Sequence, residues 1–256
     1  MSSPTWTPDA LASERRPYRG RIWRVVESQS LVSTMKLVDT LDEQAVLEDL
    51  VEAAKPPVPE RCRGLHYLLA TPFRYDAPYP RGSRFRRAGR TPGVYYAAET
   101  ARTALAETAF YRILFFAASP GTPWPANPTE FTLFAVDVET DAALDLTAAR
   151  LVRDRARWTD PVAYDATQDL AAAAREATLR IVRYASVRDR DEGVNVAVLA
   201  CEAFSTSTPT ETRTWRLHLS ATGGQAICAF PPDRIGFARD AFADDPRLAG
   251  MVWERP

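Results

Sequence analysis

One segment in the first half of this sequence gathers residue types that can hold an anion. From Arg61 to Arg90 there are eight arginines and a single acid, Asp76, although the whole chain has a formal net charge of −1. A guanidinium group can pair with two phosphate oxygens at once, and a glycine such as Gly82 lets the backbone come close to a ligand. The segment Gly82-Ser83-Arg84-Phe85 therefore suits a diphosphate.

Two other interpretations of this segment stay open. A solvated loop is the simpler explanation for most of the remaining arginines, which are Arg81, Arg86, Arg87 and Arg90. Aromatic residues among the arginines could also stack on the bases of a single-stranded nucleic acid. These are Phe73, Tyr75, Tyr79 and Phe85. The isoelectric point near 6.2 leaves no extended basic surface, so binding to duplex DNA is not expected.

Glu107 is the one carboxylate in an otherwise apolar stretch between residues 100 and 129. On a helix, its neighbours three and four positions away are Thr103, Ala104, Phe110 and Tyr111. A buried carboxylate must be protonated, paired with an arginine, or turned toward a cationic ligand. An ordinary Glu–Arg pair with Arg84 or Arg112 is one alternative, and spacing alone does not exclude it.

Two polar residues near strand ends are further candidates. Ser186 closes an apolar segment and can donate a hydrogen bond to a phosphate or ribose oxygen, and Asn195 offers both a donor and an acceptor. Such residues are more often part of turns. No Gly-x-Ser-x-Gly motif surrounds Ser186, so a nucleophilic serine is not expected.

The elements that must position these residues are predicted to form a mixed α/β domain. Residues 1–20 are polar and read as an N-terminal arm, and residues 21–256 as a single domain with inserted loops. Neither a G-x-G-x-x-G turn nor a P-loop motif is found. Helices are predicted at 39–54, 100–116 and 168–178. Strands are predicted at 22–26, 93–97, 131–138, 179–187, 194–199, 212–219 and 225–230, and residues 143–146 are expected to continue the sheet after 131–138.

Composition narrows the chemistry and the cellular location. The sequence has no apolar run long enough to span a membrane and no secretion signal at its N-terminus, which predicts a cytoplasmic protein. The three cysteines are widely spaced and are expected to be reduced, partly buried thiols: Cys62, Cys201 and Cys228. With two histidines in the chain, a metal site is not expected.

In their order along the chain, these residues resemble the RES domain, a family named for its Arg, Glu and Ser. The resemblance extends over about residues 20–240, and its most specific element is the ordered set Arg84, Tyr96, Glu107 and Ser186. The longer form, with residues 65–75 before the arginine loop, looks like the ParT branch of Xre-RES (ParST-type) toxins. The other segments that carry the resemblance are Trp23-Arg24-Val25, Gly89, Val94 to Ala97, Ala104 to Glu107, and Arg183 to Asn195.

The resemblance implies a fold similar to diphtheria-toxin-like ADP-ribosyltransferases, with a central mixed sheet and surrounding helices, and NAD as the substrate without a metal. It implies that Arg24 and Arg84 hold the diphosphate, that Tyr96 packs on the nicotinamide or its ribose, and that Glu107 faces that ribose. Ser186 is implied to bind NAD. Asn195 and Gln168 lie in segments of this sequence that match segments of the family. This sequence has Gly-Ser-Arg-Phe where the family usually has Gly-Gly-Arg-Trp, and two extra residues between Arg84 and Tyr96.

The same resemblance implies the toxin component of a type II toxin–antitoxin system. Such a toxin would cleave the nicotinamide–ribose bond and transfer ADP-ribose to a protein, for which ParT-like members suggest phosphoribosyl pyrophosphate synthetase. The expected partner is an Xre-type DNA-binding antitoxin that covers the active site, while this chain itself binds neither DNA nor membranes. The alternatives are an NAD glycohydrolase or phosphorylase and a non-enzymatic module that binds nucleotide or single-stranded nucleic acid.

Overall fold

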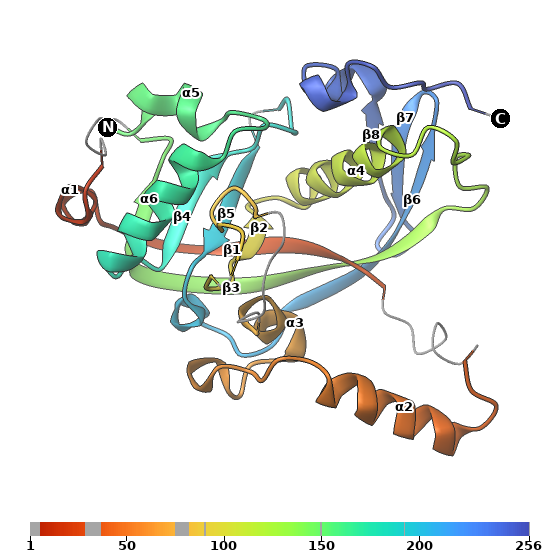
Figure 1. Cartoon of the computed structure of the whole chain (residues 1–256), viewed down its shortest axis with the longest axis horizontal. Helices are drawn as coiled ribbons and strands as arrows, with labels where there is room; N and C mark the ends of the chain where they lie inside the picture. The colour runs from red at the N-terminus through yellow and green to blue at the C-terminus, as the bar shows by residue number, and fades with distance from the viewer. Residues whose placement is uncertain are drawn as a thin grey trace.

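The computed structural model describes residues 6–28, 37–74, 82–89, 91–148, 150–191 and 193–255. Over these ranges the chain forms one mixed sheet of eight strands with helices around it (Figure 1). The strand order is β1-β2-β5-β4-β3-β6-β7-β8, and the expected mixed α/β fold is confirmed. The strands are β1 (Arg16–Glu27), β2 (Tyr95–Ala98), β3 (Thr129–Asp145), β4 (Ile181–Ala185), β5 (Val194–Val198), β6 (Glu211–Ser220), β7 (Gly223–Cys228) and β8 (Asp233–Ala238).

The helices lie in the connections between strands. α1 (Pro8–Ser13) precedes the first strand, and α2 (Leu41–Ala53) and α3 (Tyr67–Ala70) follow it. α4 (Ala101–Ala117) connects β2 to β3, whereas α5 (Arg155–Trp158) and α6 (Asp165–Glu176) connect β3 to β4. Short 3-10 turns complete the chain, including Glu60–Cys62, Cys201–Ala203 and Pro246–Leu248.

Pairing closes part of the sheet into a ring. β1 pairs with β3 along most of its length and meets β2 at Trp23 and Ala98. β2, β5 and β4 pair antiparallel in turn, and β4 returns to β3 as a parallel pair. Successive side chains of a strand point to opposite faces, so these five strands have an inner and an outer face.

The two faces build separate hydrophobic cores. The inner core takes residues from all five strands: Ile22, Tyr95, Val136, Ile181 and Val196. On the outer face, one core lies under α1 and α6 and a second lies under α4 and the β6–β8 strands. The candidate residues of β2, β4 and β5 lie on the outer face between these two cores, next to α4.

α4 forms as the sequence predicts, and it positions Glu107 above the sheet. The Thr100 side chain caps the helix by accepting a hydrogen bond from the Thr103 amide at 3.1 Å. One side of α4 is buried and consists of apolar residues at helical spacing, including Leu105, Ala109, Phe110, Ile113 and Phe116.

The N-terminal part differs from the expected arm. α1 and β1 occupy residues 8–27, and the side chains of Trp6 and Leu11 are buried in the core under α6. The start of β1 looked polar because its exposed arginines alternate with its other residues. Arg19 and Arg21 pair across the strands with Glu139 and Asp137 of β3.

The cysteines also differ from expectation. Cys62 and Cys201 form a disulfide with a Cα–Cα distance of 5.9 Å, and Cys228 is a buried thiol. The bond ties the 3-10 turn after α2 to the turn after β5, and the two cysteines are 139 residues apart in the sequence. Wide sequence spacing therefore gave the wrong prediction here, since distance along the chain does not fix distance in space. Across the described ranges, each helix is too short or too polar to cross a bilayer.

Candidate active site

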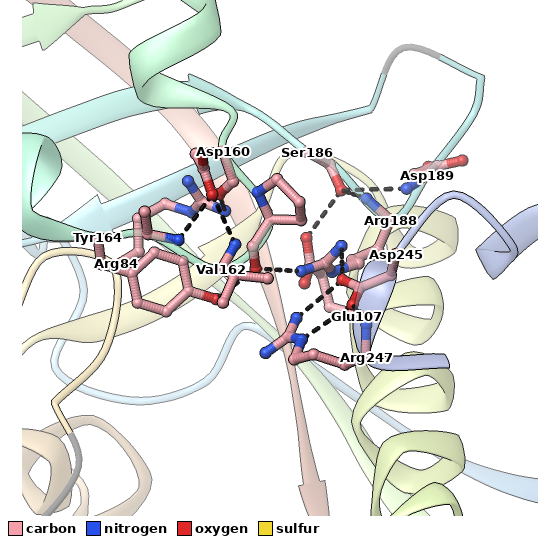
Figure 2. A network of polar contacts seen from close by, with 12 residues as sticks. Arg84, Glu107, Asp160, Val162, Tyr164, Ser186, Arg188, Asp189, Asp245 and Arg247 are labelled. Carbon is pink, nitrogen blue, oxygen red and sulfur yellow. Dashed lines mark hydrogen bonds and ion pairs between the residues drawn. The ribbon is translucent and has the colours of Figure 1, made fainter. Parts of the chain in front are cut away.

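Glu107 lies on α4 and turns a partly buried carboxylate toward the ends of β4 and β5. Its Oε1 atom accepts two hydrogen bonds, from Ser186 Oγ at 2.7 Å and from Asn195 Nδ2 at 2.6 Å. Figure 2 shows the bond from Ser186 within a wider polar network. Three residues expected to share a site from their order along the chain are thus in direct contact.

Among the described residues, none forms a direct ion pair with this carboxylate. Within the described ranges, Glu107 has no arginine, lysine or histidine nitrogen within 4.0 Å. Arg112 pairs instead with Glu27, and Arg84 binds backbone carbonyls on another loop. The alternative of an ordinary Glu–Arg core pair is therefore wrong, and the two donors that hold Glu107 are neutral.

Ser186 has its hydroxyl group fixed from both sides. The oxygen accepts hydrogen bonds from the amides of Arg188 at 3.1 Å and Asp189 at 3.2 Å. Its single proton is donated to Glu107. Because a hydroxyl group has one donor, this bond leaves Ser186 none to give a ligand while it stays in place.

The loop that carries Ser186 is fastened to α4 at a second point. Asp189 is buried and accepts a hydrogen bond from Thr103 Oγ1 at 2.7 Å. A Cβ atom on Gly193 would lie 2.4 Å from that Thr103 hydroxyl and 2.6 Å from Asp189 Oδ2. Only glycine fits this approach. Thr103 and Glu107 are one turn apart on α4, so both contacts hold the loop against the same helical face.

Strand register places the aromatic residues beside this carboxylate. Asn195 pairs with Tyr184 on one side and Ala98 on the other, and Tyr96 lies two residues before Ala98 on the same outer face. Burial is the main cause that raises the pKa of the Tyr184 phenol well above its usual value. The charge of Glu107 raises this pKa further, while that of Arg84 lowers it, so both charges act on this one phenol.

The arginine loop is folded around Gly82 and held by α6. Gly82 has φ +66°, a conformation that favours glycine, and Ser83 and Arg86 bond to each other through their backbones. Gln168 Nε2 donates to the carbonyls of both residues, at 2.9 Å and 3.2 Å. The phenol of Tyr96 is 2.8 Å from Ser83 Oγ and accepts from the loop backbone as well. Gln168 and Tyr96 thus position this loop.

Arg84 is buried and holds the neighbouring loop that leads into α6. It donates to the carbonyl oxygens of Trp158 at 2.6 Å and Asp160 at 2.8 Å, and its guanidinium lies over the Tyr164 ring at 4.8 Å. These bonds use two of its five N–H donors. Within the described residues, its other three N–H donors make no hydrogen bond.

A second arginine holds the same loop from the other side. Arg188 donates to the Pro161 carbonyl at 3.0 Å and pairs with Asp245 at 2.6 Å. Asp245 in turn receives both bonds of a bidentate pair from Arg247 at 2.9 Å. Figure 2 shows Arg84 and Arg188 on opposite sides of this loop, with Glu107 beside Arg188.

This C-terminal ion group is buried and was not predicted. The Arg188 and Asp245 side chains are 4% and 2% exposed. Burial raises the pKa of the Asp245 carboxyl, but bonds from Arg247 and the Arg188 charge outweigh burial and lower it overall. No motif marks these residues in the sequence, because their contact depends on folding of the C-terminal segment against α4.

Arg24 does not lie on the same face of the strands as Glu107. It alternates with Trp23 and Val25, which pack under α4, and its guanidinium lies 4.8 Å from the ring centre of Tyr95 in the inner core. Its NH1 donates to the Tyr96 carbonyl at 2.7 Å. Arg24 is therefore on the inner face of the strands and Glu107 on the outer side, so the geometry does not favour a shared diphosphate site for Arg24 and Arg84.

The other residues of the arginine loop divide into two groups. Arg86 is buried and donates to Thr91, which contradicts a solvated position, whereas Arg87 is exposed and pairs with Asp169. Phe73 and Phe85 are both buried, so they cannot stack on bases. Four residues considered from the sequence lie outside the described ranges: Tyr75, Tyr79, Arg81 and Arg90.

The chain matches a known protein family in sequence. A sequence model described as the RES domain matches residues 58–220. No curated protein matches the chain in sequence. A solved structure, titled as the M. tuberculosis MbcT-MbcA toxin-antitoxin complex, is similar at 16% identity and a TM-score of 0.44, over 81% of this chain and 92% of the matched chain.

Proposed function

This chain belongs to the RES domain family, and from that premise we propose that it cleaves the nicotinamide–ribose bond of NAD and transfers ADP-ribose to a protein. RES domain toxins act on NAD. One observation in this structure carries the proposal: Glu107 is an unpaired carboxylate held by two neutral donors among aromatic side chains. Such a group is suited to meet positive charge that develops on a substrate.

The chemistry of the bond agrees with this residue. As nicotinamide departs, positive charge develops on the ribose, as it does in glycoside cleavage. A carboxylate fixed in place before the reaction stabilises that charge without reorganising. Nicotinamide leaves as a neutral base, so the reaction needs no strong general acid. Glu107 would supply the electrostatic stabilisation, while Ser186 and Asn195 hold its Oε1 atom.

The arginine loop fits the anionic part of the substrate. Arg84 keeps three N–H donors beyond its bonds to Trp158 and Asp160, and a guanidinium can bind two diphosphate oxygens. We assign diphosphate binding to Arg84 and contact with the nicotinamide ribose to the ring of Tyr96. In this proposal Ser186 and Asn195 act on Glu107, and not primarily on NAD.

The proposed acceptor is a protein side chain, with phosphoribosyl pyrophosphate synthetase as the candidate target. The chain would then act in the cytoplasm as the toxin of a type II pair, with an Xre-type antitoxin covering the face around Glu107. Transfer to water or to phosphate is the alternative outcome of the same bond cleavage. Base stacking by a nucleic-acid module is not supported by the two described aromatic residues of the loop, since Phe73 and Phe85 are buried.

The test is to follow NAD, its products and protein adducts by mass spectrometry. Purified protein is incubated with NAD alone, with phosphate, and with purified phosphoribosyl pyrophosphate synthetase. We expect nicotinamide release, together with a mass increase on the synthetase equal to one ADP-ribose. Release of free ADP-ribose or its phosphate ester without an adduct would establish the hydrolase or phosphorylase alternative. Intact NAD in all three incubations would refute the proposal.

A further inference from the structure

α2 has the reverse of the usual pattern for a surface helix. Gln44 is its one buried residue within the described ranges, at 7% exposure. Val46 and Leu50 are one turn apart and are 58% and 63% exposed. Figure 1 shows α2 extending away from the ring of strands beyond α3. The apolar side of this helix is therefore turned away from the rest of the protein.

This apolar side is hollowed and rimmed by acids. A shallow depression of about 360 Å³ is lined by Asp42, Glu43, Val46, Leu47 and Leu50. Positions 43, 46, 47 and 50 fall on one helical stripe, since they are three and four residues apart. Exposed apolar stripes of this kind mark contacts with other molecules more often than isolated surface residues do.

The charge of α2 restricts what can cover the stripe. Between Leu41 and Ala53 there are five acids and no basic residue: Asp42, Glu43, Glu48, Asp49 and Glu52. Glu52 pairs with Arg74 and Lys55, outside the helix, and Glu43 caps the helix N-terminus. Asp42 and Asp49 lie along one edge of the stripe. A second copy of α2 docked on this face would bring like charges together, which is unfavourable.

We propose that α2 is a docking surface for a helical segment of a protein partner, with an apolar stripe flanked by lysine or arginine. The apolar residues of the partner fill the depression beside Val46 and Leu50. Its basic residues lie against Asp42 and Asp49, as in other complexes that place an amphipathic helix in a groove. α2 precedes residue 58 and lies outside the segment that the family match covers. The site is independent of Glu107 and of NAD.

The test uses two synthetic helical peptides and the full chain. Both peptides carry leucines at positions i, i+3, i+4 and i+7; one has lysines at the flanking positions and the other glutamates. Binding is measured by fluorescence anisotropy at physiological salt. We expect the lysine peptide to bind at least about tenfold more tightly than the glutamate peptide, a difference that one or two charge contacts can supply.

Two variants separate the contributions of shape and charge. Val46→Ser with Leu50→Ser should weaken binding of the lysine peptide by at least about tenfold, since burying each side chain favours association. Leu41→Ser is the matched control, because Leu41 is exposed on α2 but lies off the stripe, and it should leave binding unchanged. Asp42→Lys with Asp49→Lys should reverse the preference toward the glutamate peptide. Thermal unfolding followed by circular dichroism checks that each variant is folded.

Three results would overturn this proposal. They are equal affinity for the two peptides, loss of binding in Leu41→Ser to the same degree as in the double serine variant, and no binding at all. Sedimentation analysis of the free chain tests whether a second copy of the chain covers α2 instead. A dimer that Val46→Ser with Leu50→Ser dissociates would mean that a second copy covers α2, contrary to the charge argument.

Discussion

At the scale of single residues, the main finding is how Glu107 is held. Two neutral donors fix one carboxylate oxygen, and within the described ranges Glu107 has no direct ion pair with an arginine or lysine. A salt bridge would have reduced the ability of this group to stabilise a cationic sugar, since the carboxylate would already be neutralised. The proposed role of Glu107 therefore depends on its having no direct ion pair with an arginine of the described residues.

Ser186→Ala tests whether this serine positions Glu107. The change removes one hydrogen bond to the carboxylate and leaves two loop amides without their acceptor. We expect kcat for nicotinamide release to fall by about 10- to 100-fold, the range for losing a hydrogen bond to a charged group. KM for NAD should stay near the wild-type value. Steady-state kinetics with varied NAD give both quantities.

The exposed Ser205→Ala provides the control and should behave like the wild type. A large rise in KM with kcat unchanged in Ser186→Ala would show that Ser186 binds NAD directly. That outcome would favour the role implied by family resemblance over the one drawn from the geometry.

Much of the site could be predicted at this scale, and the exceptions have physical causes. Glu107, Ser186 and Asn195 were recognisable because a lone acid on an apolar helix and polar strand ends are local patterns. Arg24 lies on the other face of the strands from Glu107, which could not be predicted, since a motif does not say which face of a strand its side chain takes. Asp245 was missed because its partners come from distant parts of the chain.

At the scale of elements, α4 is joined by direct contacts to Ser186, Asp189 and Gly193 of the loop after β4. Gly193→Ala would place a Cβ atom 2.4 Å from Thr103 Oγ1, so the loop must move off α4. We expect nicotinamide release to fall by at least about tenfold, because displacements near 1 Å in a catalytic group cost up to about 100-fold in rate. The same assay measures this effect.

Gly236→Ala is the matched control, since a Cβ atom there meets nothing within 4 Å. Wild-type turnover in Gly193→Ala would show that the close contact with Thr103 is not needed for the position of Ser186.

The C-terminal turn contacts the candidate site through Asp245, which pairs with Arg188. Asp245→Asn removes the anion between two arginines and leaves the buried Arg188 without its charge partner. We expect the free energy of unfolding to fall by about 3 kcal/mol, the lower end for breaking a buried ion pair. Nicotinamide release should fall as well, because Arg188 holds the loop beside Arg84. Urea unfolding and the product assay measure the two effects.

Asp244→Asn changes the adjacent acid, which is 92% exposed, and should leave stability nearly unchanged. Equal stability of the Asp245→Asn and Asp244→Asn variants would show that the C-terminal ion group does not brace the fold.

Most elements were predictable because they follow simple periodicity. The strands at residues 131–138 and 194–199 and the helix from residue 100 are found with small shifts in their ends. β8 was missed, since Asp233–Ala238 is a short, mainly exposed edge strand without an alternating apolar pattern. α1 was missed because a helix of six residues depends on packing against α6.

At the scale of the whole molecule, the Cys62–Cys201 disulfide links the α2–α3 region to the strand that carries Asn195. Closing a loop of this length is worth about 5 kcal/mol in the chain-entropy model. We expect dithiothreitol to lower the Tm by about 10 °C in a chain of this size. Differential scanning fluorimetry with and without the reductant provides the measurement.

Cys62→Ser with Cys201→Ser should show the lower Tm without reductant and no further response to it. Cys228→Ser is the control, because Cys228 is a free thiol, and this variant should keep the response. An unchanged Tm of the wild type on reduction would mean that the disulfide does not stabilise the fold.

The central claim joins all three scales: the fold presents Glu107 to the nicotinamide ribose of NAD. The most direct measurement is nicotinamide released from NAD by the wild type and by Glu107→Gln, which keeps size and hydrogen-bond acceptor but removes charge. We expect the variant to be folded and at least about 100-fold slower, the scale for losing a preorganised electrostatic contact. The exposed Glu130→Gln should match the wild type. A wild-type rate in Glu107→Gln would contradict the account.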